Sequence, residues 1–193
     1  MQDFNNPITS HQAWARFLDA LATYASRDPI HIEQAEAFAT LSLARDGADP
    51  YKRQRLAAHF TGSAWLVSAD GQRALLTHHR KLNRWLQLGG HADGDRDLAQ
   101  VALREAQEES GLSGLTVDQE IFDLDRHWIA DHEDVPGHWH YDVRYVVRAS
   151  ADEAFRVSHE SHALAWRPVV ELLQASDCDA SMRRMARKWL GRG

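Results

Sequence analysis

The sequence has a single cysteine, Cys178, so no intrachain disulfide can form and a reducing compartment is consistent. No apolar run approaches the roughly 20 residues that a membrane span needs. The N-terminus lacks the basic and apolar regions of a signal peptide. Runs of lysine or arginine, internal repeats and low-complexity segments are also missing. These absences predict a cytoplasmic protein that does not enter a membrane.

Positive charge is in short supply, with 22 lysines and arginines against 28 aspartates and glutamates, a formal net charge of −6. This balance argues against general affinity for a nucleic acid polymer or an anionic membrane. An anionic substrate would therefore need a local cation. The 193 residues suffice for one sizeable domain plus an extension.

The stretch 88–112 combines a glycine-rich loop with a short predicted helix. Asp95 or Asp97 can act as the N-cap of this helix, and Gly111 can close it. The loop before the helix contains three glycines that allow tight or left-handed turns: Gly89, Gly90 and Gly94.

One side of this helix is apolar, and three carboxylates share the other side: Glu105, Glu108 and Glu109. Like charges three and four residues apart repel each other, and the last two also lie near the negative end of the helix dipole. A bound divalent cation would reverse both effects. Carboxylate oxygens with no thiolate nearby suit Mg²⁺ or Mn²⁺. A solvated acidic face is the alternative interpretation of these glutamates.

The same stretch resembles the Nudix box, G-x₅-E-x₇-R-E-U-x-E-E-x-G-U, in which U is an aliphatic residue. The matching positions follow without a gap: Gly90, Arg104, Glu105, Ala106, Glu108, Glu109, Gly111 and Leu112. One position departs from the pattern, since Arg96 stands where the box has its first glutamate. The resemblance implies that this glutamate braces the motif arginine, and we expect Asp95 or Asp97 to do so here.

The resemblance implies a fold and a reaction. The fold is an α/β Nudix sandwich, α/β/α with mixed sheets, preceded by an N-terminal helical extension. The reaction is hydrolysis of a diphosphate linkage in a nucleoside diphosphate linked to another group. The partner is then a small nucleoside diphosphate derivative, and a homodimer is compatible with the sequence. A non-catalytic Nudix-like nucleotide-binding or regulatory module is the main alternative.

The resemblance also implies roles for individual residues. Glu105, Glu108 and Glu109 would hold Mg²⁺ or Mn²⁺, with a backbone contact to the metal from Gly90. Arg104 would orient the glutamates through a charge-assisted bond. The residues expected to shape the loop or contact the substrate are Gly89, Gly90, His91 and His140.

The water-activating base is expected outside the helix, because metal binding lowers the proton affinity of the box glutamates. In the resembling family this carboxylate often comes from a late loop before the final strand. Glu160 lies in such a loop, ahead of Trp166. Glu133 and the helix glutamates are the rival candidates.

An isomerase branch resembles the same family but uses a catalytic cysteine. The single cysteine, Cys178, lies far from the box, so we discount this alternative.

Histidines gather on both sides of the Pro136-Gly137 turn, and they invite a zinc interpretation: His127, His132, His138 and His140. The Cys/His spacing of structural zinc sites is missing, so we favour the interpretation that these histidines line a polar wall of the substrate site or lie on the protein surface. His138, His140 and Asp142 alternate on one predicted strand face.

Residues 1–57 are predicted to be a helical extension docked on a domain formed by residues 58–193. Ser10 can cap a first helix, Asp28-Pro29 interrupts it, and a second helix ends near Gly47. Asp49-Pro50 predicts a third helix to about Ala58. Strands are expected at 61–67, 73–78, 85–88, 115–125 and 141–148, with a last helix at 180–190.

Overall fold

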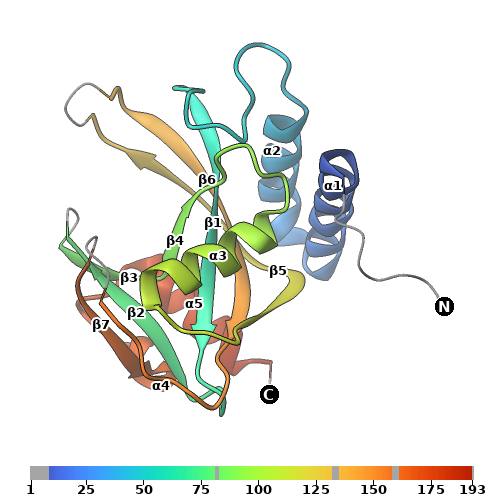
Figure 1. Cartoon of the computed structure of the whole chain (residues 1–193). Coiled ribbons are helices and arrows are strands. Elements are labelled where there is room, and N and C mark those ends of the chain that lie inside the picture. Colours follow the sequence, from blue (N-terminus) through green and yellow to red (C-terminus); the bar gives the residue numbers. More distant parts are fainter. Residues whose placement is uncertain (1–8, 81–82, 132–134, 158–160, 193) are drawn as a thin grey trace.

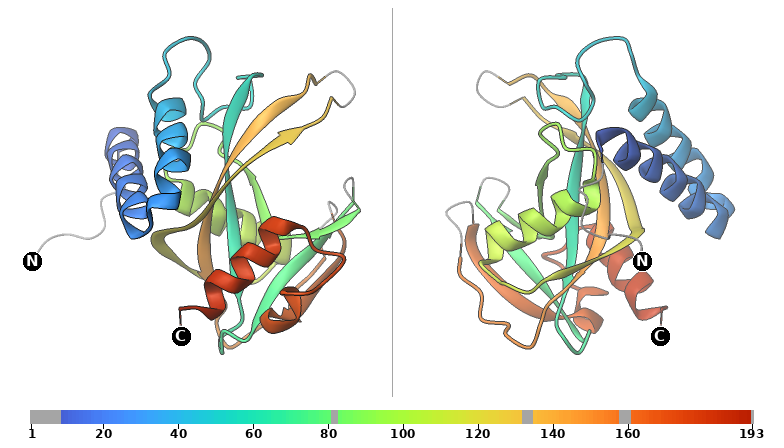
Figure 2. Two further views of the ribbon diagram at one scale, coloured as in Figure 1. Left: turned by 180° about the vertical axis from the view of Figure 1, so that it is seen from behind. Right: turned by 45° about the vertical axis from the view of Figure 1, so that its right-hand side comes forward.

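The computed structural model describes residues 9–80, 83–131, 135–157 and 161–192. Helices cover both faces of a central sheet, which is the predicted α/β/α layering (Figure 1). The helix α3 (Leu98–Ser110) lies on one face of the sheet, and α5 (Ala180–Leu190) lies on the other (Figure 2). A single turn of helix, α4 (Val169–Leu172), leads toward α5.

The seven-stranded sheet is mixed. Its main path runs in the order β3-β2-β1-β6-β5, while β4 pairs with β1 and β7 pairs with β2. Strands β1 and β6 are parallel, and the other pairs within the described residues are antiparallel. The strands are β1 (Ala58–Val67), β2 (Arg73–His79), β3 (Arg84–Leu86), β4 (Leu88–His91), β5 (Thr116–Ile129), β6 (His138–Arg148) and β7 (Ser161–Pro168).

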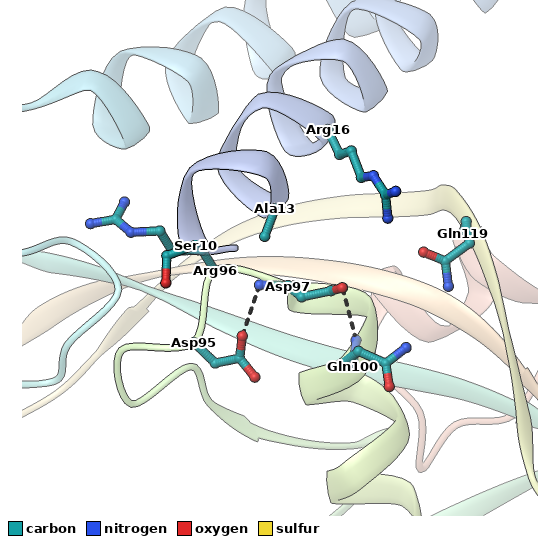
Figure 3. A pocket seen from close by; sticks show the side chains of 8 residues that line it. All are labelled: Ser10, Ala13, Arg16, Asp95, Arg96, Asp97, Gln100 and Gln119. Carbon is teal, nitrogen blue, oxygen red and sulfur yellow. Dashed lines mark hydrogen bonds between the residues drawn. The ribbon is translucent and has the colours of Figure 1, made fainter. Parts of the chain in front are cut away.

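The first two predicted helices are present as α1 (Ser10–Arg27) and α2 (Ile32–Leu43), joined by the 3₁₀ turn η1 (Pro29–His31). The N-cap of α1 is Thr9 instead of Ser10, because Thr9 and Gln12 form a reciprocal capping box. A cavity of about 530 Å³ lies between α1 and the start of α3 (Figure 3). None of the predicted catalytic or metal-binding residues within the described ranges lines it.

The prediction of a third helix, from Asp49-Pro50 to about Ala58, is wrong. Turns occupy this segment, and β1 already begins at Ala58. The Asp49 carboxylate accepts the N–H of Tyr51 at 3.0 Å, and the carbonyl of Pro50 accepts the N–H of Phe60 at 2.9 Å. These bonds fold the chain back so that the Tyr51 ring is buried against Phe60.

The N-terminal helices pack against the sheet through apolar and polar contacts. Phe17 and Phe38 of these helices both contact Phe60 of β1. Arg27 pairs with Glu120 of β5 at 2.6 Å, and the Gln34 amide donates to a β5 carbonyl at 2.8 Å. The division of the chain at residue 57 stays a prediction.

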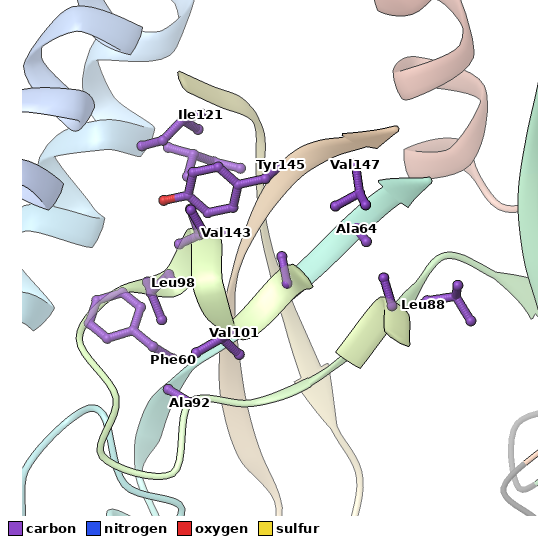
Figure 4. Close-up of a cluster of buried hydrophobic side chains, with 14 of the residues drawn as sticks. Phe60, Ala64, Leu88, Ala92, Leu98, Val101, Ile121, Val143, Tyr145 and Val147 are labelled. Atoms are coloured by element: carbon purple, nitrogen blue, oxygen red, sulfur yellow. The ribbon is translucent and has the colours of Figure 1, made fainter. Parts of the chain in front are cut away.

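The apolar core has two parts, one on each face of the sheet. Between the sheet and α3 lie alternate residues of β1 and β6 together with the apolar side of α3 (Figure 4). The other part holds Trp65, Val146 and the buried methionines of α5. No helix within the described ranges combines the length and the apolar character that crossing a bilayer requires.

The strands β5 and β6 extend beyond their predicted bounds at the ends that pair with each other. β5 runs on to Ile129 instead of ending near Asp125, and β6 begins at His138 instead of Tyr141. Trp128 and Trp139 face each other across these extensions with ring centroids 5.4 Å apart. Aromatic pairs across an antiparallel ladder stabilise it, which accounts for the extra length.

Candidate active site

Both predicted caps of α3 are confirmed. The Asp97 carboxylate accepts the N–H of Gln100 at 3.2 Å, and Gly111 ends the helix at a φ of 68°, which favours glycine. The apolar side of the helix packs onto the sheet, and Ala99, Ala102 and Ala106 are all buried. Since this side is fixed, the glutamates are held at the opposite side, beside the glycine loop.

Glu109 joins the helix directly to that loop. Its carboxylate accepts the backbone N–H of Gly89 at 2.8 Å, and the residue is only 8% exposed. A hydrogen bond to a carboxylate is stronger than one between neutral groups, so this contact fixes the loop relative to α3.

Gly90 lies so close to Glu105 that a side chain at this position would displace the carboxylate. A Cβ added at Gly90 would lie 2.5 Å from Oε2 of Glu105, although the φ of Gly90 is not in the left-handed region. A Cβ at Gly89 would meet both the hydroxyl and the backbone of Ser63. These two glycines therefore serve close packing, and they bring the strand β4 up to the carboxylates.

Arg104 lies among the acidic groups. Its Nη2 donates to Oε1 of Glu105 at 3.1 Å and to the carbonyl of His91 at 3.4 Å, and its Nε lies 4.0 Å from Oε1 of Glu108. Asp95 approaches Arg104 at 3.9 Å, whereas Asp97 is engaged in capping the helix. This geometry places the arginine where it can hold the glutamate side chains in position.

Arg96 lies away from this group. Its guanidinium pairs with Asp49 at 2.9 Å and lies 4.5 Å from the centre of the Tyr51 ring. The residue that departs from the box pattern therefore connects the loop to the segment before β1.

The donor set suits a hard divalent cation. Arg104 contacts Glu105 and approaches Glu108, while Glu109 holds the Gly89 N–H, so carboxylates outnumber the arginine and every side-chain donor that could hold a cation here is an oxygen. The side chain of Glu108 is 65% exposed while that of Glu105 is 18% exposed, which leaves one side open to water and substrate. Glu160 and Glu133, the candidate bases from the loops, lie outside the described residues.

His140 and His91 lie together in a group that sequence reasoning did not assemble. The group consists of His59, His91, His138 and His140, and we call it the histidine cluster. Burial, with help from Arg53 and His59, lowers the pKa of His91 to about 4. Burial and the neighbouring histidines lower the pKa of His140 to about 2. These rings are therefore neutral at pH 7.

Asp142 is a buried hub that sequence reasoning also missed. Its carboxylate accepts hydrogen bonds from Thr61 at 2.8 Å, Ser63 at 2.7 Å and Gln87 at 3.2 Å, and from Nε of Arg144 at 2.7 Å. Ser63 is also the residue against which Gly89 packs. The hub thus supports the strand that carries the glycine loop. The alternation of His138, His140 and Asp142 on one strand face was the available signal.

Comparison with known proteins identifies a family by sequence and the same fold among solved structures. A family model for the NUDIX domain matches residues 59–189. A search of curated proteins found no match. Three similar solved structures are a NUDIX-family hydrolase from Clostridium perfringens, an Ap4A hydrolase from C. elegans and a MutT protein from Methanosarcina mazei.

These structures resemble the chain over most of their own length. The C. perfringens hydrolase has a TM-score of 0.56 and 23% identity, with 69% of this chain and 97% of that chain covered. The C. elegans protein has 0.54 and 18%, with 69% and 96% covered. The M. mazei protein has 0.56 and 16%, with 72% and 96% covered. At these identities the solved structures establish the fold alone.

Proposed function

Because the chain belongs to the Nudix family of hydrolases, we propose that it cleaves, with a divalent metal ion, a diphosphate linkage in a nucleoside diphosphate joined to another group. The observation that carries this proposal is the packing of the α3 glutamates against the glycine loop. Glu109 accepts the N–H of Gly89, and Glu105 fills the space that a side chain at Gly90 would need. The three helix glutamates of the box are retained, which argues against a purely regulatory module, although Arg96 replaces the first glutamate of the box.

Glu105, Glu108 and Glu109 would hold Mg²⁺ or Mn²⁺, with the backbone of Gly90 beside them. When bound, such a cation neutralises charge on the diphosphate oxygens and lowers the pKa of a nearby water. Arg104 keeps the carboxylates oriented, since it contacts Glu105 and approaches Glu108.

The other roles come from neighbouring residues. Glu160 would take the proton of the attacking water, with Glu133 as the rival base. His91 and His140 would lie along the substrate, and Gly89 would fix the loop by its hydrogen bond to Glu109.

The substrate is proposed only by class. The C. elegans structure carries the name Ap4A hydrolase and the M. mazei structure the name MutT, and both share the fold with this chain at low identity. The residues that select a base or sugar lie outside the box. Oxidised nucleoside triphosphates, nucleotide sugars, dinucleoside polyphosphates and nucleotide coenzymes are therefore all candidates.

Product release from a panel of these four substrate classes, with and without Mg²⁺, tests the proposal. We expect one class to be hydrolysed in Mg²⁺ and none in a chelator. The matched variants are Glu108→Gln, which should be inactive, and Glu36→Gln, which changes an exposed glutamate on α2 and should retain full activity. Binding of a nucleotide without turnover in Mg²⁺ would support the regulatory alternative instead.

We also propose that residues 58–193 form the hydrolase domain and that residues 1–57 are an extension docked on it. The family match at residues 59–189 supports this division, as do the contacts of α1 and α2 with β1 and β5. A cytoplasmic location and a homodimer stay predictions.

A further inference from the structure

Three histidines from three different strands converge at one place. His59 is on β1, His91 on β4 and His140 on β6, and each offers a ring nitrogen within 4.8 Å of those offered by the other two. The sheet register explains this meeting, because β1 pairs His59 with His140 on one side and Thr61 with His91 on the other. His138 lies beside the three, with its ring 4.9 Å from that of His59.

The protonated nitrogens of two rings are already fixed by the backbone. Nδ1 of His59 donates to the carbonyl of Arg55 at 3.1 Å, and Nδ1 of His138 donates to that of Pro136 at 2.8 Å. Such a bond sets the tautomer of a neutral imidazole, whose Nε2 then carries the lone pair.

The lone pair of His138 is used, but that of His59 is not. Nε2 of His138 lies 3.2 Å from Nε2 of His140. Since Nδ1 of His138 already donates, its Nε2 accepts, so Nε2 of His140 donates and the lone pair of His140 is on Nδ1. Nε2 of His59 has no hydrogen-bond partner among the described residues, although the residue is only 2% exposed. A buried acceptor without a partner destabilises the folded chain, and a bound cation would remove this penalty.

We propose that His59, His91 and His140 form a second metal site, which takes a transition-metal ion of the Zn²⁺ type, with His138 orienting His140. Neutral imidazole nitrogens suit zinc, cobalt or nickel, whereas Mg²⁺ prefers oxygen. Three histidines leave one position of a tetrahedral zinc ion open.

This site is separate from the carboxylate site. Successive residues of a strand point to opposite faces, and paired residues of neighbouring strands share a face. Gly90 is paired with Gly62 and faces Glu105 on α3, while His91 is paired with Thr61 on the other face of the sheet. The two sites therefore lie on opposite faces of β4, at neighbouring residues.

Binding needs only a modest contraction of the cluster. Zinc–nitrogen distances of about 2.0–2.1 Å put two nitrogens of a tetrahedral ion about 3.4 Å apart. The three nitrogens lie within 4.8 Å of one another, so each ring has to move by about an ångström or less. A bound ion would link β1, β4 and β6 at the base of the glycine loop, and would thereby stiffen the strand that carries Gly90.

The test uses the full chain, stripped of metal with a chelator and then loaded with Zn²⁺ in the presence of excess Mg²⁺. After desalting, we expect about one zinc ion to remain per chain. His59→Gln should weaken zinc binding by roughly 100-fold. Glu108→Gln and His162→Gln, which change the carboxylate site and an exposed histidine on β7, should retain the zinc.

The wild-type chain provides a readout that does not depend on variants. Nitrogen-15 spectra of its histidines should show a zinc-dependent shift at the ring nitrogens of His59, His91 and His140, even if His59→Gln fails to fold. No retained zinc in the folded wild-type chain would overturn the proposal. Zinc that is lost in Glu108→Gln but kept in a folded His59→Gln would also overturn it, because the ion would then be at the carboxylates.

Discussion

Gly90→Ala separates the geometry of the active site from the stability of the fold. The added methyl carbon would lie 2.5 Å from Oε2 of Glu105 and 2.6 Å from its carboxyl carbon. An ordinary contact begins at about 3.4 Å, so the carboxylate has to move by about 0.9 Å. A misplacement of about 1 Å at a reacting centre can lower the rate by about 100-fold.

The fold should tolerate this substitution. The φ of Gly90 is not positive, and the atoms that clash belong to the end of a flexible side chain. We therefore expect kcat/KM with Mg²⁺ to fall by about 10- to 100-fold, while the melting temperature stays within a few degrees of wild type. Steady-state kinetics and thermal unfolding measure the two effects.

Gly89→Ala and Gly47→Ala are the matched controls. A Cβ at Gly89 meets the backbone of Ser63 at 2.8 Å, so this variant should lose stability as well as activity. A Cβ at Gly47 meets only the end of Arg55 at 3.2 Å, so this variant should keep both. Full activity in Gly90→Ala would refute the reasoning, because Glu105 would then not need its observed position.

Three further changes test other parts of the structure. Arg96→Glu should leave turnover unchanged but cost about 1–2 kcal/mol in thermal unfolding, since it removes the ion pair with Asp49 and a cation–π contact. Arg144→Met should lower the free energy of unfolding in urea by about 3–5 kcal/mol, because it leaves the buried carboxylates of Asp123 and Asp142 without this cation. Burial by itself would lower the pKa of His127, but the hydrogen bond to Asp125 outweighs burial and raises this pKa. The His127–Asp125 pair therefore stabilises the fold fully below the ordinary histidine pKa, and this stabilisation is lost as the pH rises through the raised pKa. His127→Gln should therefore reduce stability more at about pH 5 than at about pH 9, and equal losses would contradict this.

The parts of the site that are local in sequence could be predicted. The caps of α3 and the acidic face follow from residues within one turn or one loop, and each follows from helix geometry alone. The contact of Gly89 with Glu109 joins residues that are 20 positions apart, and Gly89 lies just before the first box position, Gly90, so the box pattern brings the two segments together without predicting this bond.

The parts that depend on strand pairing could not be predicted. His59 and His140 meet only because β1 and β6 run parallel in one particular register, and a shift by one residue would turn the rings to opposite faces. The sequence does not show that Asp142 is buried, because its partners Thr61 and Ser63 come from a neighbouring strand about 80 residues away. The third helix failed for a similar reason, since the burial of Tyr51 against Phe60 overrides the local Asp-Pro signal.

The central claim is that the α3 glutamates hold the divalent cation, and a Mn²⁺ titration followed by electron paramagnetic resonance tests it most directly. We predict that Glu108→Gln and Glu109→Gln each weaken Mn²⁺ binding on the order of 100-fold. Their unfolding free energies should stay within about 1 kcal/mol of wild type, since each change relieves like-charge repulsion and an amide oxygen can still accept the Gly89 N–H. Glu36→Gln should bind Mn²⁺ as the wild type does. Unchanged Mn²⁺ affinity in both α3 variants would contradict the account.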